Sequence, residues 1–170
     1  AKFAVEALKK IEVDTNSTQM PHGKIEEERF SYFYKDQITG LYNQTYLDLV
    51  LVQNSNSKIY KIINFISIHN FSHFNQSNGW QEGDVLLNSI GAYLLQKFGD
   101  YLIFRFEGDD FIIISDKQVG IDISNIEELL LKAHPILDIS FDTFNIEAKE
   151  IFSLLKFQKV LKHRNKGLCK

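Results

Sequence analysis

Cysteine is almost absent from this chain. Its 170 residues include one cysteine, Cys169, so no disulfide can form within the chain, and a reducing compartment is expected. Proline occurs twice, no apolar run approaches the roughly 20 residues that span a bilayer, and no signal peptide is recognisable. These absences exclude a disulfide-stapled secreted scaffold. They predict a cytoplasmic protein that makes no direct contact with a membrane.

An excess of positive charge is missing as well. The formal net charge is −3, so the chain has no global attraction to nucleic acid, and we expect no nucleic-acid partner. A hydrophobic content of 44% is enough for one sizeable core, and the length is too short for two comfortable domains. The chain begins at Ala1. We therefore expect a piece of a longer polypeptide, whose other parts could hold membrane or sensor segments.

Two carboxylates stand between two apolar segments. Residues 101–106 and 111–115 are rich in aromatic and β-branched side chains, as strands are, and a Gly108-Asp109 pair suits a two-residue hairpin connection. Asp109 and Asp110 would then lie at the tip of the hairpin. A solvated turn accounts for these acids as readily as a metal or phosphate site does.

The remaining pattern predicts several helices and strands. Asn43 is a candidate cap for a helix that resumes at Tyr46, and residues 54–57 are expected to end it. The expected helices cover residues 4–11, 24–34, 46–52, 83–98, 125–133 and 149–162, and the expected strands cover 59–69, 101–106, 111–115 and, as one or two strands, 136–146. This order predicts an α+β sandwich with a mostly antiparallel central sheet and helices packed outside.

Three blocks of sequence resemble a known family. Residues 36–43 (D-Q-I-T-G-L-Y-N) resemble the D-x-L-T-G-L-x-N signature of GGDEF domains, the bacterial diguanylate cyclase family, and residues 107–111 (E-G-D-D-F) resemble the motif that names it. A third block carries the Phe, Asn, Gly, Gly and Asp of the family pattern at Phe71, Asn75, Gly79, Gly83 and Asp84. The resemblance covers roughly residues 30–166.

The resemblance implies a fold and an activity. The fold would be the nucleotide-cyclase, ferredoxin-like sandwich, with residues 1–25 as an N-terminal linker or helical appendage and residues 26–170 as the GGDEF-like domain. The family joins two GTP molecules into cyclic di-GMP in a transient dimer and uses Mg²⁺ to position the triphosphates. Guanine nucleotide, a homodimer and other domains of the same polypeptide are the partners that it implies.

The resemblance also implies roles for individual residues. Asn75 and Asp84 correspond to the residues that hydrogen-bond the guanine edge, and Gly108 to a nucleotide-binding position of the turn. Asp109 corresponds to the metal-binding carboxylate, and Asp110 to the neighbouring acid of the catalytic tip. Without the motifs, Asn75 and Asp84 would be read as a loop residue and an acid at a helix N-terminus.

Several family positions are altered. The other metal-binding carboxylate falls on Ser67, whose neutral hydroxyl cannot supply the charge that Mg²⁺ needs. A phosphate-binding lysine becomes Ser72, and the first glycine of the named motif becomes Glu107. His69 is expected to be a strand-end histidine with a hydrogen-bond partner, and Trp80 is either a core residue or an exposed contact.

Three functions remain open from the sequence. The favoured one is a degenerate GGDEF domain that regulates cyclic di-GMP signalling and binds guanine nucleotide through Asn75 and Asp84. The second is an active diguanylate cyclase with an altered metal site built on Asp109, Asp110 and a water held by Ser67. The third is a ligand-free dimerisation or linker module.

Overall fold

The computed structural model describes residues 22–146; residues 1–21 and 147–170 are left out of this description. The helices and strands are α2 (His22–Tyr34), α3 (Gln44–Ser57), β1 (Ile62–His69), α4 (Phe71–Asn78), α5 (Trp80–Phe98), β2 (Leu102–Phe106), β3 (Asp110–Ser115), α6 (Ser124–Ala133) and β4 (Asp138–Asn145). The helices predicted over residues 4–11 and 149–162 lie outside the described residues.

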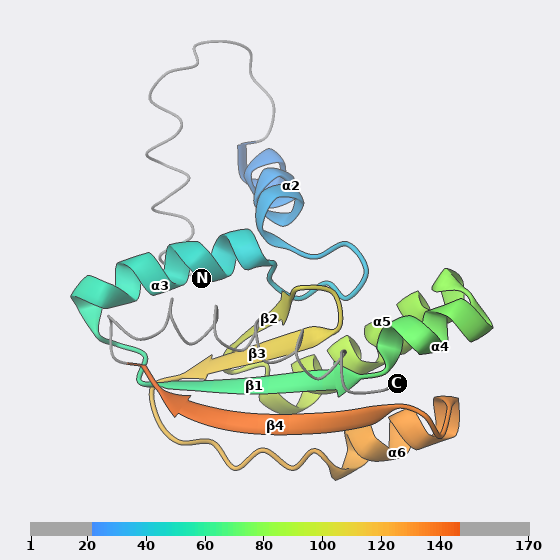
Figure 1. Cartoon of the computed structure of the whole chain (residues 1–170). Coiled ribbons are helices and arrows are strands. Elements are labelled where there is room, and N and C mark those ends of the chain that lie inside the picture. The colour runs from blue at the N-terminus through green and yellow to red at the C-terminus, as the bar shows by residue number, and fades with distance from the viewer. Residues whose placement is uncertain (1–21, 147–170) are drawn as a thin grey trace.

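The four strands form one antiparallel sheet in the order β2-β3-β1-β4 (Figure 1). β1 is central, because it pairs with β3 on one side and β4 on the other. Its interior residues are all buried, which explains why apolar residues occupy both of its faces in the sequence. The predicted α+β sandwich with an antiparallel sheet is the observed architecture, and residues 136–146 supply one strand rather than two.

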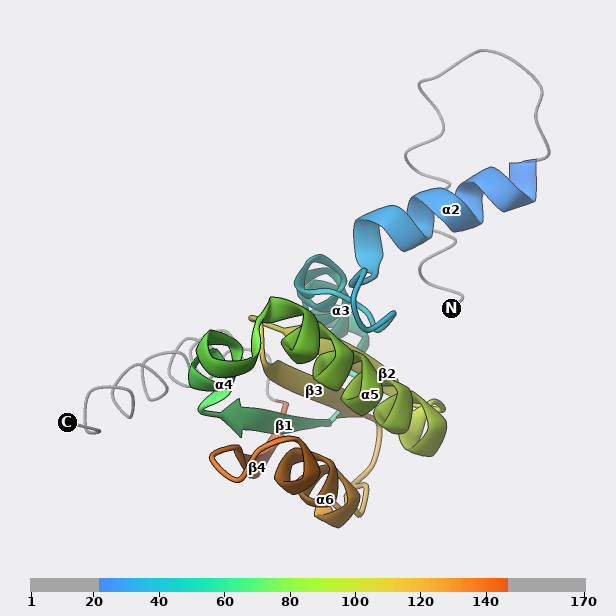
Figure 2. The same ribbon diagram turned by 90° about the vertical axis from the view of Figure 1, so that its right-hand side faces the viewer.

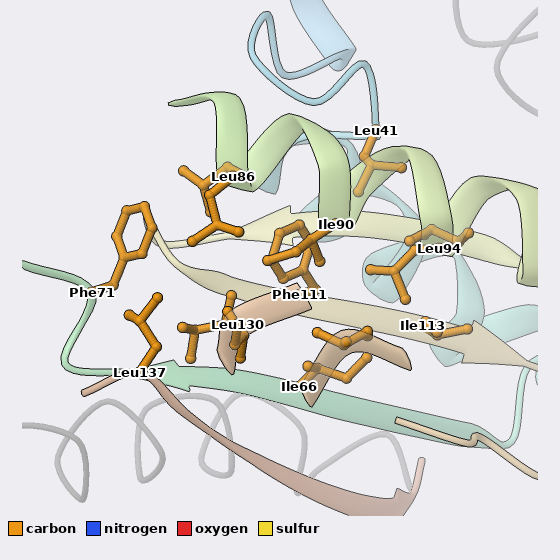
Figure 3. Close-up of a cluster of buried hydrophobic side chains, with 14 of the residues drawn as sticks. Leu41, Ile66, Phe71, Leu86, Ile90, Leu94, Phe111, Ile113, Leu130 and Leu137 are labelled. Atoms are coloured by element: carbon orange, nitrogen blue, oxygen red, sulfur yellow. The ribbon is translucent and has the colours of Figure 1, made fainter. Parts of the chain in front are cut away.

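Helices cover both faces of the sheet. α4, α5 and α6 lie over one face, where the apolar side of α5 meets β1 and β3 (Figures 2 and 3). Leu86, Ile90 and Leu94 of α5 are buried there at the predicted helical spacing. α3 covers the other face at β2 and β3, where Leu47 packs with Phe104. The sheet thus contributes residues to two apolar clusters, one on each of its faces.

α3 is longer than the sequence pattern predicts. Asn43 caps it as expected, since its side-chain oxygen accepts a hydrogen bond from the Tyr46 backbone N–H at 3.1 Å. The predicted break at residues 54–57 is wrong. Asn54 is buried, and its amide bonds the Tyr60 backbone N–H at 2.8 Å and carbonyl at 3.0 Å, so the tertiary contact holds this polar turn helical. Lys58, at a φ of 50°, ends the helix.

α4 is a helix that the sequence pattern did not reveal. It is mostly polar, and two buried aromatic residues, Phe71 and Phe74, fix it to the core. α5 then begins at Trp80, three residues earlier than predicted. Asp84 therefore lies in the second turn of α5 rather than in its first, where Glu82 is the acidic residue.

The hairpin connection is also longer than predicted. Phe106 pairs with Asp110, so the loop between β2 and β3 consists of three residues, Glu107, Gly108 and Asp109. Glu107 and Gly108 both have positive φ, at 40° and 86°. A two-residue Gly-Asp turn would have paired Asp110 with Glu107, whereas the observed loop pairs it with Phe106.

α2 extends away from the sheet (Figure 2). Aromatic rings join it to the domain, with the ring of Phe30 5.6 Å from that of Tyr46 on α3. None of the helices within residues 22–146 combines the length and apolar character required to cross a membrane.

Candidate nucleotide-binding site

The predicted site residues gather at one end of the sheet. β1 ends there at His69, α4 leaves from it, and the β2–β3 loop turns beside it (Figure 1). The backbone N–H of Ile68 donates to the carbonyl of Asp109 at 3.3 Å, which joins the end of β1 to the loop. The altered strand end and the acidic tip are therefore direct neighbours, although more than forty residues separate them in the sequence.

Ser67 and Asp110 form the centre of this end. They stand opposite each other in the β1–β3 register, and the Ser67 hydroxyl donates to Asp110 Oδ1 at 2.6 Å. Both side chains are buried, with exposed fractions of 6% and 3%. A solvated turn therefore does not account for Asp110, because its carboxylate is enclosed and hydrogen-bonded by its neighbour.

Asp109 has a different setting. It is half-buried in the loop, and its backbone N–H bonds the Glu107 carbonyl at 3.1 Å. Its sequence-predicted metal partner, Ser67, bonds Asp110 instead. The part of the chain that the structure describes holds no group of three His, Cys, Asp or Glu side chains arranged for a metal ion. With Ser67 bonded to Asp110, these residues do not fit a Mg²⁺ site held by paired carboxylates.

Arg105 and Asp36 hold the hairpin loop in place. Arg105 Nε donates to the Gly108 carbonyl at 2.7 Å, and its guanidinium forms an ion pair with Asp36 at 2.9 Å. Asp36 Oδ2 also accepts hydrogen bonds from the backbone N–H and hydroxyl of Thr39, each at 2.8 Å. Residues 36–43 thus support the turn that carries Asp109. This role of Arg105 was not predicted, although the sequence shows it as a lone cation two residues before an acidic turn.

Asn75 and Gly83 join α4 to α5. Asn75 is buried, with an exposed fraction of 6%, and its Oδ1 has no hydrogen-bond partner among the described residues. A Cβ added to Gly83 would lie 2.0 Å from this oxygen, so glycine is what allows the amide to lie there. Asp84 follows Gly83 and is exposed. The structure therefore brings the two predicted base-binding residues to the same α4–α5 junction.

The other altered positions have simpler settings. His69 Nε2 lies 2.9 Å from the Ser140 hydroxyl of β4, which confirms the expected strand-end histidine with a hydrogen-bond partner. Ser72 is exposed on α4. Trp80 is 74% exposed, so it is not a core residue.

The chain belongs to the GGDEF domain family of diguanylate cyclases, whose family model matches residues 33–152. It is 34% identical over 103 residues to the diguanylate cyclase DgcP of Escherichia coli (strain K12), a match that covers 56% of this chain and 29% of DgcP. The matched part is thus less than a third of that relative's length.

Two solved structures share the fold. The coiled coil and GGDEF domain of DgcB from Caulobacter crescentus, in complex with c-di-GMP, has a TM-score of 0.65 at 15% identity, over 99% of this chain and 96% of that one. The S helix-GGDEF-EAL structure of Vibrio cholerae LapD, bound to c-di-GMP, has a TM-score of 0.55 at 16% identity, over 71% of this chain and 31% of that one. These likenesses confirm the predicted family fold.

Proposed function

We propose that this chain is a catalytically impaired GGDEF domain of a cyclic di-GMP signalling protein. It acts as a regulatory module in the cytoplasm and binds a guanine nucleotide through Asn75 and Asp84. Residues 26–170 would form the functional domain, and residues 1–25 would connect it to other domains of the same polypeptide. A second copy of the chain is a further partner. The names of its relatives, a diguanylate cyclase and c-di-GMP-bound GGDEF structures, support the pathway.

The observation that carries the proposal is the Ser67–Asp110 hydrogen bond. Mg²⁺ is bound through one or two carboxylates together with phosphate oxygens and waters, and the resemblance implies two carboxylates at this site. Here a neutral hydroxyl stands in place of one of them and donates to Asp110 at 2.6 Å. Phosphoryl transfer depends on electrostatic stabilisation of the triphosphate, so the loss of one carboxylate and of a cation at Ser72 weakens it. Asp109 and Asp110 remain as the acids of the tip, without the metal pair that would make them effective.

The residues at the α4–α5 junction support the proposed binding of a guanine base. The buried Asn75 Oδ1 has no partner within residues 22–146, and the exposed carboxylate of Asp84 lies one residue beyond Gly83. A carboxylate accepts hydrogen bonds, and guanine offers N1–H and N2–H donors on one edge. An Asn amide both donates and accepts, so the two residues together suit a guanine edge.

Thermal melting of the purified 170-residue chain tests this function. We expect GTP or GDP at about a hundredfold excess over Kd to raise Tm by about 5–10 °C, because a ligand that binds only the native state stabilises it. Asn75→Ala and Asp84→Ala should abolish the shift. Asp100→Ala, which removes an exposed acid two residues beyond the C-terminal end of α5, is the matched control and should keep the shift.

The same samples, with and without Mg²⁺, are assayed for cyclic di-GMP. The proposal predicts no product. Product that disappears in Asp109→Ala would instead establish an active cyclase with an altered metal site. No shift with GTP, GDP or cyclic di-GMP at millimolar concentration would establish a ligand-free module.

A further inference from the structure

Trp80 is a large apolar side chain that is exposed to solvent and therefore contributes little to the stability of the fold. It is the one tryptophan of the chain, and 74% of it is accessible to solvent. It is the first residue of α5, directly after Gly79, whose φ of 92° separates α5 from α4. Burial of an aromatic side chain stabilises a protein or a complex substantially, so an exposed indole beside a candidate site is a candidate ligand contact.

Helix geometry places Trp80 beside the base-binding residues. Residues three and four apart share one side of a helix, so Trp80, Gly83 and Asp84 lie on the same side of α5. Helical side chains lean toward the helix N-terminus, which directs the carboxylate of Asp84 toward the turn of Trp80. Asn75 packs against Gly83 from α4, with its unpartnered Oδ1 2.0 Å from the position of an added Cβ.

We propose that the indole of Trp80 is a stacking platform for the guanine base held by Asn75 and Asp84. This inference rests on the proposed function, and it adds a residue to the binding site. Asn75 and Asp84 recognise the edge of the base, while Trp80 covers its face. Stacking on an aromatic ring does not depend on the charge of the phosphates. It would therefore supply affinity at a site where Ser67 and Ser72 replace the residues that would bind metal and phosphate.

The arrangement also defines specificity. Any purine has a face that stacks on an indole, so Trp80 contributes affinity without choosing the base. Asp84 makes the choice, because its carboxylate can accept from the N1–H and N2–H of guanine, and adenine lacks both donors. GMP should therefore bind and AMP should not, although both could stack.

Intrinsic fluorescence gives a direct readout, since Trp80 is the only fluorescent indole of the chain. Titration of the 170-residue chain with GMP in Mg²⁺-free buffer should quench the emission to a plateau, because a stacked purine quenches indole. Affinity is measured in parallel by calorimetry, which does not depend on the tryptophan. Trp80→Ala should raise the Kd for GMP about tenfold, whereas Trp80→Phe should raise it about twofold because it keeps an aromatic face.

Leu95→Ala is the control. Leu95 is a large apolar side chain of the same helix, 54% exposed and about 22 Å further along it at 1.5 Å per residue, so GMP affinity should not change. If Trp80→Ala binds GMP like the parent chain while Asn75→Ala does not bind, the stacking inference is wrong and the proposed function stands. If the parent chain does not bind GMP in calorimetry, both are wrong.

Discussion

The α4–α5 junction and the β2–β3 hairpin lie at the same end of the sheet, yet their polar groups are in opposite states. At the junction, Asn75 Oδ1 is buried and has no partner among the described residues. At the hairpin, the Asp110 carboxylate already accepts a hydrogen bond from Ser67. A buried polar atom without a partner costs about 1–3 kcal/mol and so calls for an explanation, which a ligand would supply.

Under the proposed function, this difference separates a junction that binds a base from a hairpin whose carboxylate is bonded within the core. The hairpin has kept its frame, since Arg105 and Asp36 still hold the loop through Gly108. The altered residues at the hairpin therefore affect its side-chain chemistry and not the position of the loop. The comparison predicts that variants of the hairpin alter stability and metal response, and that variants of the junction alter nucleotide binding.

The largest expected effect is that of Arg105→Ala. It removes the ion pair with Asp36 and the hydrogen bond to Gly108, and the two charged side chains are only 13% and 20% exposed. We expect the free energy of unfolding, measured by urea denaturation, to fall by about 3 kcal/mol, because Asp36 is left without its cation.

Lys132→Ala is the control for Arg105→Ala. Lys132 pairs with Glu128 at 2.7 Å on the exposed surface of α6, and its removal should leave the unfolding midpoint unchanged. GMP affinity of the folded Arg105→Ala variant should also match that of the parent chain. A large loss of GMP affinity would remove the distinction between hairpin and junction.

Ser67→Asp should produce the next largest effect. Two buried carboxylates would then face each other across β1 and β3, which we expect to cost about 2 kcal/mol of stability in EDTA. Mg²⁺ should restore that stability, since it neutralises the pair. Ser67→Ala also loses stability but gains no metal response. Equal melting points of Ser67→Asp with and without Mg²⁺ would contradict this account of the hairpin.

Gly83→Ala tests the junction. The added Cβ would lie 2.0 Å from Asn75 Oδ1 and 3.1 Å from the Phe71 ring, so the Asn75 amide must move. Overpacking costs about 1–3 kcal/mol, and the better helix propensity of alanine returns about 1 kcal/mol. Stability should therefore fall by about 1 kcal/mol, while calorimetry should show a GMP Kd at least tenfold higher.

Gly23→Ala on α2 is the matched control for Gly83→Ala. An added Cβ there meets nothing within 4 Å, so GMP affinity should be unchanged. Normal GMP binding by Gly83→Ala would show that the position of the Asn75 amide does not matter.

Glu107→Gly should have the smallest effect. Glu107 has a φ of 40°, a left-handed conformation that costs a side-chain-bearing residue about 1–2 kcal/mol, and glycine loses about 0.5–1 kcal/mol in chain entropy. We expect the free energy of unfolding to change by less than about 1 kcal/mol in urea denaturation, because the relief of the backbone conformation is offset by the chain entropy of glycine and by the loss of the glutamate's own interactions. Glu82→Gly, inside α5, should instead lose about 1 kcal/mol. A clear loss of stability in Glu107→Gly would show that the loop depends on the glutamate side chain.

Local patterns predicted much of the fold. The helix predicted over residues 83–98 corresponds to α5, and the strand predicted over residues 59–69 corresponds to β1. α4 was missed because two buried phenylalanines, rather than a periodic apolar face, fix it to the core. The end of α3 was misplaced because Asn54 is held by Tyr60, a tertiary contact that no local pattern encodes.

The residues of the candidate site could be proposed from the sequence, but the contacts between them could not. The motifs gave Asn75, Asp84, Asp109 and Asp110 as candidates and showed the altered residue at Ser67. That Ser67 bonds Asp110 depends on the register of β1 against β3, two strands that pair across more than forty residues of sequence. The hairpin turn, predicted with two residues and observed with three, sets only the register of β2 against β3, so no local pattern predicts the contact between Ser67 and Asp110.

The most direct test of the central claim compares the affinities of guanosine, GMP, GDP and GTP for the 170-residue chain, by calorimetry, with and without Mg²⁺. If the base contacts at Asn75 and Asp84 are kept while the metal and phosphate contacts are lost, the four Kd values should agree within about threefold and should not respond to Mg²⁺. A Kd that falls tenfold or more from GMP to GTP, only when Mg²⁺ is present, would show a working triphosphate site and contradict the account.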